Sequence, residues 1–167
     1  MGGSMTDAVN RNISYMQDNS RFNFRVAGIV LDADRVLLHQ AKQDDFWNLP
    51  GGRVEMNEST EDAIRREMME ELSVSIQVEK LAFVCEDFYE YDGKEMHEIG
   101  FYYVISLPEG HSFYDEPEFN GLERDGELTF RWFPIQETEQ MEIYPVFLRK
   151  ELVNLRDASS IRHFIQR

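Results

Sequence analysis

Three glutamates near the end of a predicted helix are the residues whose type and spacing point most directly to chemistry. Glu67, Glu70 and Glu71 stand at positions i, i+3 and i+4, which places their side chains on one face of a helix. Negative charge at a helix C-terminus opposes the macrodipole and is unfavourable by a few tenths to ~1 kcal/mol per group. The like-charged pair Glu67 and Glu71 adds a repulsion of roughly 0.2–0.5 kcal/mol. The cluster therefore destabilises the helix unless something compensates its charge.

A divalent cation is the partner that these side chains suit. Hard cations take oxygen ligands, and Mg²⁺ binds through a few carboxylates together with water and substrate phosphates. A bound cation would offset both unfavourable terms. The alternative is a solvated helix face that is rich in glutamate and binds nothing. The motif around the glutamates favours the metal site, for which we expect Mg²⁺, with Mn²⁺ as a possible substitute.

The helix that carries the glutamates is predicted from its caps and its periodicity. Ser59 begins it, and Asp62 three residues later fits a capping box. Ser73 ends it. Apolar residues recur at every fourth position and form a face of their own, namely Ile64, Met68 and Leu72. The helix is thus expected to dock by one face and to present its carboxylates on another.

The stretch from Gly52 to Val74 resembles the Nudix box, the signature of the MutT-like Nudix hydrolases. The matching residues, in order, are Gly52, Glu58, Arg66, Glu67, Met68, Glu70, Glu71 and Val74. The one departure is Ser73, which stands where the pattern has a glycine. That glycine would be a left-handed C-cap, and a serine there costs ~1 kcal/mol without touching the chemistry. The segments NLPGG (48–52) and RWFPI (131–135) also resemble the family.

The resemblance implies a Nudix fold and Mg²⁺-dependent hydrolysis of a diphosphate bond, by attack of water on phosphorus, in a nucleoside diphosphate linked to another group. It implies four metal ligands, which are the carbonyl of Gly52 and the carboxylates of Glu67, Glu70 and Glu71. It also implies that Arg66 and Glu58 pair to hold the loop–helix–loop motif rigid. One carboxylate could serve as general base instead of ligand, and Glu70 is our choice. Metal ions neutralise diphosphate charge and lower the pKa of bound water, so positioning and electrostatics do most of the catalysis.

A further carboxylate after the motif is expected, because family members often add a base or ligand there. Glu127 is the first candidate for this catalytic role, and Glu118 and Glu123 are its rivals. For each of them the alternative is a solvated surface position.

Candidate substrate contacts lie on both sides of the motif. Arg53 and Arg25 could hold phosphate oxygens with planar, bidentate donors, although Arg25 could instead form a cross-strand ion pair. Trp47, with its neighbour Phe46, could stack on a base or could pack in the core. Tyr89 and Tyr91 resemble a tyrosine of relatives that act on dinucleoside polyphosphates, in a stretch already rich in aromatics.

The elements that must position these residues follow from pattern and turn chemistry. Strands are predicted at 24–31, 36–41, 76–91, 96–107 and 127–133, and the first two form a hairpin. A second helix is predicted over 144–155, a short helix or a lead-in over 6–20, a long functional loop over 108–126, and a frayed tail. The expected fold is α+β, an α/β/α sandwich of the Nudix type with a mixed β-sheet between helices.

The whole chain sets limits on the class of protein. Its 167 residues, 42% of them hydrophobic, suit one domain over 5–167, and residues 1–4 (MGGS) read as an expression scar. A single cysteine, no signal peptide and no long apolar run suggest a cytoplasmic protein without a membrane span. A homodimer is compatible with the sequence. The net charge of −15 repels polyanions.

An active enzyme on a small nucleotide diphosphate is therefore the expected function, with the substrate between the loops at 42–53 and 108–126. One alternative is a catalytically inactive Nudix fold that serves as a ligand-binding or regulatory module, which would have little reason to keep all three glutamates. The other is an RNA-end pyrophosphohydrolase, against which the net charge and the lack of a basic patch argue.

Overall fold

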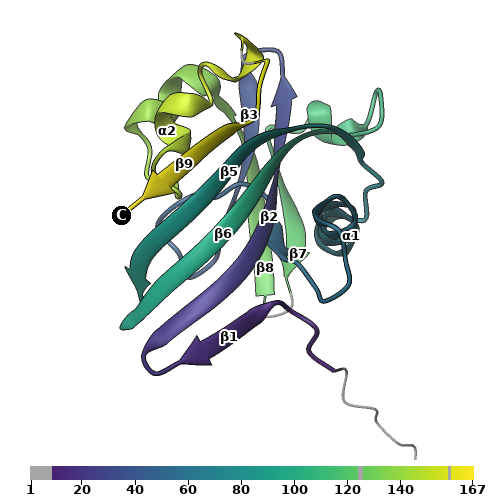
Figure 1. The fold of residues 1–167 in the computed structure, drawn as a ribbon. Coiled ribbons are helices and arrows are strands. Elements are labelled where there is room, and N and C mark those ends of the chain that lie inside the picture. The colour runs from purple at the N-terminus through teal and green to yellow at the C-terminus, as the bar shows by residue number, and fades with distance from the viewer. Residues whose placement is uncertain (1–8, 124–125, 158) are drawn as a thin grey trace, which may run out of the picture.

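A mixed β-sheet forms most of the computed structural model, which describes residues 9–123, 126–157 and 159–167 (Figure 1). The expected scar at residues 1–4 lies outside these ranges. The strands are β1 (Ser14–Gln17), β2 (Ser20–Asp32), β3 (Arg35–Ala41), β4 (Gly51–Arg53), β5 (Gln77–Tyr91), β6 (Lys94–Ser106), β7 (Glu118–Glu123), β8 (Gly126–Pro134) and β9 (Arg162–Gln166). The α-helices are α1 (Thr60–Leu72) and α2 (Leu148–Glu151), and 3₁₀ turns cover Ser112–Tyr114, Ile135–Gln140 and Leu155–Asp157.

The strand order is β7-β8-β3-β2-β6-β5-β9, and β1 and β4 pair with β2. The pairs β2–β6 and β5–β9 are parallel, whereas the other pairs are antiparallel. The predicted hairpin is present, because Leu31 and Val36 face each other across the turn between β2 and β3. The expected mixed sheet is confirmed. Within the described residues no helix is long and apolar enough to cross a membrane.

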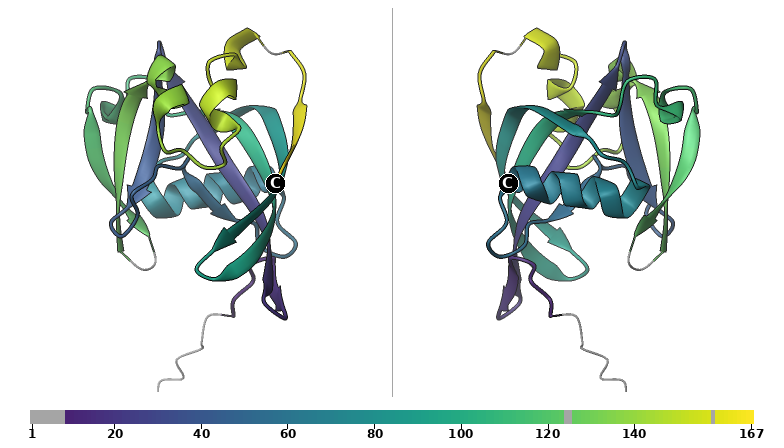
Figure 2. Two further views of the ribbon diagram at one scale, coloured as in Figure 1. Left: turned by 90° about the vertical axis from the view of Figure 1, so that its left-hand side faces the viewer. Right: turned by 90° about the vertical axis from the view of Figure 1, so that its right-hand side faces the viewer.

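The sheet separates two apolar layers, since successive side chains of a strand point to opposite faces. Val26 and Val30 of β2 pack in the layer that includes Ile64 and Met68 of α1. Ala27 and Ile29, between them, pack instead with the α2 segment. Figure 2 shows α1 on one face and α2 with its neighbouring turns on the other. Complete burial of Ile64 or Met68 contributes about 1.5–3 kcal/mol, so α1 is held firmly by its apolar face.

The predicted helix over 144–155 is wrong in extent, because only Leu148–Glu151 is α-helical. Tyr144 precedes Pro145, and a residue before proline is disfavoured in helical conformation. The apolar residues after it are buried by a run of turns instead.

Three further expectations are also corrected. Within the predicted loop at 108–126, residues 118–123 form β7, where Phe119 is buried and stacks on Phe130 of β8 with ring centroids 5.5 Å apart. The tail is not frayed, since β9 pairs with the edge of β5. Within residues 6–20, expected to be a short helix or a lead-in, residues 14–17 form β1. In each case long-range pairing overrides a weak local signal.

Candidate functional site

Local signals set the position of the glutamate cluster at the end of α1. Ser59 caps the helix N-terminus, and its hydroxyl accepts a hydrogen bond from the Asp62 N–H. Ser73 ends the helix in the left-handed conformation, with φ 56° and ψ 36°, and its N–H donates to the Met69 carbonyl. The three glutamates thus occupy the last turns of a helix whose two ends are both fixed.

Gly52 lies directly against the carboxylate of Glu67. A Cβ atom on Gly52 would be 2.4 Å from Glu67 Oε1 and 2.6 Å from Oε2, closer than a side chain tolerates. The contact arises because β4 pairs with β2, where Gly52 faces Val26, and this brings the strand over α1. Burial raises the pKa of Glu67, an effect that the charge of Arg66 opposes. A side chain at this position would therefore force the Glu67 carboxylate to move from its contact with Arg66.

Arg66 connects the loop and the helix of the motif. It donates from Nε and Nη2 to the two oxygens of Glu58, at 2.8 and 2.9 Å, and from Nη2 to the Arg53 carbonyl at 3.1 Å. Its Nη1 lies 2.9 Å from Glu67 Oε1 and 3.3 Å from Glu70 Oε2. The hydrogen bond from Arg66 lowers the pKa of Glu58. One guanidinium thus braces the loop and contacts one oxygen of each of two candidate metal ligands.

The other two glutamates differ strongly in exposure. The Glu71 side chain is 7% exposed, and its Oε2 lies 4.0 Å from Nδ1 of buried His39. Burial lowers the pKa of His39 to about 3, so this ring is neutral at pH 7 and the contact is not an ion pair. The Glu70 side chain is 54% exposed. As the side chains stand in the described ranges, no three acidic, histidine or cysteine groups converge closely enough to hold an ion.

Two arginines face each other beside the glutamates. Arg25 of β2 and Arg53 of β4 are direct partners in an antiparallel pair, and like charges in such positions repel. Burial and then the charges of Arg21 and Arg25 lower the pKa of Arg53. The pKa of Arg25 is raised overall, because Glu98 and other groups outweigh the effect of its burial. An anion bound between the two guanidinium groups would relieve their repulsion.

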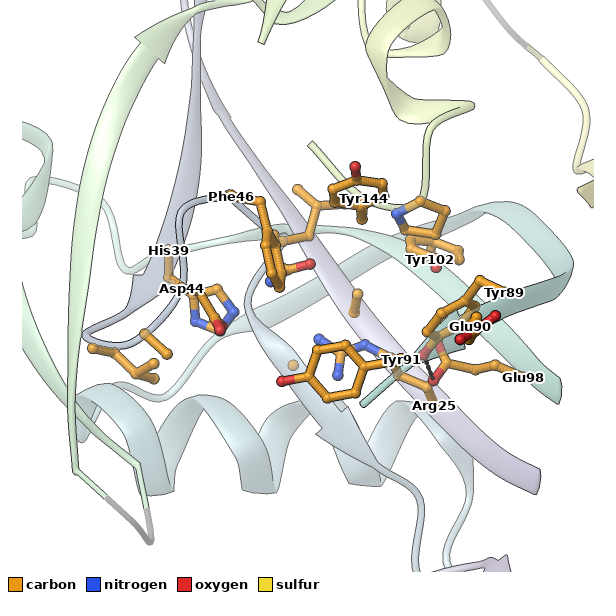
Figure 3. Close-up of a pocket in the computed structure, with 17 residues that line it drawn as sticks. Arg25, His39, Asp44, Phe46, Tyr89, Glu90, Tyr91, Glu98, Tyr102 and Tyr144 are labelled. Carbon is orange, nitrogen blue, oxygen red and sulfur yellow. Dashed lines mark hydrogen bonds between the residues drawn. The ribbon is translucent and has the colours of Figure 1, made fainter. Parts of the chain in front are cut away.

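These groups line one cavity of about 620 Å³, which contains Gly52, both arginines and all three glutamates. A second cavity, of about 470 Å³, adjoins it and shares Arg25 and Gly51 in its lining (Figure 3). Its aromatic residues are Phe46, Tyr89, Tyr91, Tyr102 and Tyr144. Its acidic residues are Asp44, Glu90 and Glu98. We call these two spaces the glutamate cavity and the aromatic cavity.

Two residues that were predicted to belong to the functional site lie outside both cavities in the described part of the chain. Trp47 packs edge-on against Phe133, with centroids 4.7 Å apart, and lines neither cavity. Glu127 is exposed on β8 and also lines neither. Its rival Glu118 pairs with Arg131 at 2.6 Å. The Glu123 side chain is outside the described part of the structure.

The substrate site expected between the loops at 42–53 and 108–126 stays a prediction, and the cavities show which of these residues lie together. From residues 42–53 the aromatic cavity takes Asp44, Phe46, Asn48, Leu49 and Gly51, and its facing wall comes from Tyr89 and Tyr91 of β5. From residues 108–126, the glutamate cavity takes Leu122. Sequence reasoning missed Glu98 and Tyr102. They lie four residues apart on one face of β6, a period-two signal that could have found them.

Residues 21–152 match the family model described as the NUDIX domain. The chain is 38% identical to a MutT-like protein of Streptomyces ambofaciens over 60 residues, which are 35% of this chain and 39% of that protein. It is 33% identical to an 8-oxo-dGTP diphosphatase of Proteus vulgaris over 79 residues, 44% of this chain and 70% of that protein. The aligned segment thus spans well under half of the Streptomyces protein.

A solved structure of an ADP-ribose pyrophosphatase from Streptococcus suis has the same fold. It covers 86% of this chain and 98% of its own, with a TM-score of 0.57 and 12% sequence identity.

Proposed function

Because the chain belongs to the NUDIX family, whose members generally use divalent metals, we propose that it is a Mg²⁺-dependent hydrolase that cleaves the diphosphate bond of a small nucleotide. Mn²⁺ is expected to substitute. The relatives support this class of reaction, since one is named a diphosphatase and the protein of similar fold a pyrophosphatase.

The contact between Gly52 and Glu67 is the observation that carries the proposal. The backbone of β4 approaches a carboxylate so closely that a Cβ would lie 2.4 Å from its oxygen. Gly52, Glu67, Glu70 and Glu71 all line the glutamate cavity, and their carbonyl and carboxylate oxygens would form an all-oxygen donor set that suits Mg²⁺. A divalent ion bound there would neutralise diphosphate charge and lower the pKa of a bound water.

Side chains of the protein bind the phosphate groups and the base, hold the motif in place and accept a proton. Arg25 and Arg53 hold phosphate oxygens through charge-assisted hydrogen bonds. Arg66 and Glu58 hold the loop and the helix of the motif together, and the carboxylates reorient from their present positions to surround an ion. Glu70, the most exposed of the three, accepts the proton of the attacking water. The aromatic cavity receives the base, against rings such as Phe46 and Tyr91.

A panel of nucleotides assayed with Mg²⁺ tests the proposal. It should contain 8-oxo-dGTP and dGTP, ADP-ribose, a UDP-sugar and a 5′-triphosphorylated RNA, with products identified by mass. The proposal expects cleavage between phosphorus atoms of a small nucleotide, with a nucleoside monophosphate among the products. A strong preference for the RNA would favour RNA-end processing instead. No cleavage of any panel member would favour a binding module.

A further inference from the structure

The C-terminal strand β9 lies outside the residues that match the family model, which end at 152. It runs parallel to β5 and covers that edge of the sheet (Figure 1). Phe164 of β9 stacks on Phe147, just before α2, with centroids 4.6 Å apart and planes at 19°. Arg162 forms an ion pair with Glu151. The strand therefore joins β5 to the α2 segment.

Gln166 makes this connection with a single amide group. Its Nε2 donates to Asp87 Oδ1 at 3.1 Å, and its Oε1 accepts from the Phe147 N–H at 2.9 Å. Asp87 belongs to β5 and is 5% exposed. Both halves of the amide are used, so the side chain has one orientation and fixes the distance between β5 and the segment before α2.

The two groups that Gln166 joins support opposite walls of the aromatic cavity. Tyr89 and Tyr91 follow Asp87 on the same face of β5, since alternate residues of a strand share a face. Tyr144 and Pro145, which precede Phe147, line the cavity from the other side. In Figure 3, Tyr144 lies above the cavity and Tyr89 and Tyr91 lie below it.

We infer that Gln166 is a positioning residue that sets the width of the aromatic cavity and thereby helps to select the nucleotide base that the enzyme accepts. The inference rests on the proposed function, because it assigns the base to this cavity. Gln166 touches no substrate itself. It acts through Asp87 on one wall and through Phe147, beside Tyr144 and Pro145, on the other.

The surroundings of Asp87 provide a specific test. Burial, and then the charge of Glu98 opposite it on β6, raise the pKa of Asp87 to about 6. Other titratable groups that interact with Asp87 from β5 and β6 are Cys85, Tyr89 and Tyr102. A carboxyl group at position 166 could still accept from the Phe147 N–H, but it could bond to Asp87 only while the two carboxyls share a proton.

The experiment compares Gln166→Leu, Gln166→Glu and the control Ile165→Gln, a substitution at an exposed neighbour on β9. KM and kcat are measured at pH 5.5 and pH 8 with the best nucleotide of the panel, each relative to wild type at the same pH. Gln166→Leu removes both hydrogen bonds and should raise KM about fivefold or more at both pH values, with kcat within about twofold. In Gln166→Glu, KM should be raised at pH 8 and should be close to the wild-type KM at pH 5.5. Ile165→Gln should match wild type.

Wild-type KM in both Gln166 variants at both pH values would overturn the inference. So would a fall in kcat at unchanged KM. A second measurement does not need catalysis, so failure of the proposed function stays distinguishable. Amide hydrogen exchange at Phe147 should be faster in Gln166→Leu than in Ile165→Gln, and equal rates would also overturn the inference.

Discussion

Gly52 and Glu67 are packed so that a Cβ on the glycine would overlap the carboxylate, at 2.4 Å from Oε1. The two residues come from different elements, β4 and α1, and their contact depends on the pairing of β4 with β2. This contact brings Gly52 of β4 and Glu67 of α1 together in the lining of the glutamate cavity, where the proposed ion would bind. The proposed chemistry depends on this contact.

Gly52→Ala should therefore impair catalysis more than folding. The added methyl group must displace the Glu67 carboxylate or the β4 backbone, and a displacement of about 1 Å can lower activity about 100-fold. Overpacking should reduce the free energy of unfolding by about 1–3 kcal/mol. Steady-state kinetics and urea unfolding measure the two effects. A variant with kcat/KM within about twofold of wild type would show that the tight approach has no catalytic role.

Mg²⁺ should stabilise the folded protein if the glutamates bind it. An ion that binds the native state at concentrations well above its Kd should raise Tm by about 5 °C for a chain of this size. Glu70→Gln and Glu71→Gln should reduce this shift. Glu61→Gln should keep it, because Glu61 lies in the first turn of α1 and pairs with Arg65. Thermal unfolding with EDTA and with millimolar Mg²⁺ provides the comparison, and equal shifts in all four proteins would count against the site.

Arg53→Ala should weaken catalysis with little effect on stability. A charge-assisted phosphate contact contributes about 1.5–3 kcal/mol, so kcat/KM should fall about 10- to 150-fold. Arg65→Ala is the matched control, since Arg65 pairs with Asp62 at 3.3 Å on the exposed side of α1 and lines neither cavity. Steady-state kinetics and melting curves of both variants measure the effects on catalysis and on stability. If the two arginine variants have the same kcat/KM, Arg53 does not hold phosphate.

Asp87 should make stability depend on pH. Its pKa is raised to about 6 in the folded state, whereas an unfolded aspartate titrates near 4. The native state therefore binds the proton more tightly, and stability is lost as pH rises from about 4 to 6. Asp87→Asn, whose amide oxygen can still accept from Gln166, should be more stable than wild type at pH 8 and should lose this advantage near pH 4. Melting curves across this range test the sign, and a difference independent of pH would refute the assignment.

The local parts of the site could be predicted from sequence because local physics determines them. The start of α1 at Ser59, its end at Ser73 and the shared face of the glutamates follow from capping and helical spacing. The β2–β3 hairpin follows from turn chemistry. None of these features needs information from distant residues.

The substrate-facing residues could not be predicted in the same way, because long-range packing selects them. Phe46 and Trp47 are adjacent aromatic residues, and the sequence makes both of them candidates for stacking on a base. Only the position of Phe133 shows that Trp47 packs inward. Glu127 pairs with Leu122 of β7, which lines the glutamate cavity, but Glu127 itself lines neither cavity, and only the packed structure shows this. Tyr144 lines the aromatic cavity from a segment that was predicted to be helical but precedes α2 in the structure.

The most direct test of the central claim is hydrolysis of the best panel nucleotide in ¹⁸O-labelled water, with Mg²⁺ or EDTA, by wild type and Glu71→Gln. Glu71 lies on the wall of the glutamate cavity. We expect a rapid reaction only when Mg²⁺ is present, one ¹⁸O atom in a phosphate product, and a rate lower by about 100-fold or more in the variant. A wild-type rate in Glu71→Gln, an undiminished rate in EDTA, or phosphate products without the label would contradict it.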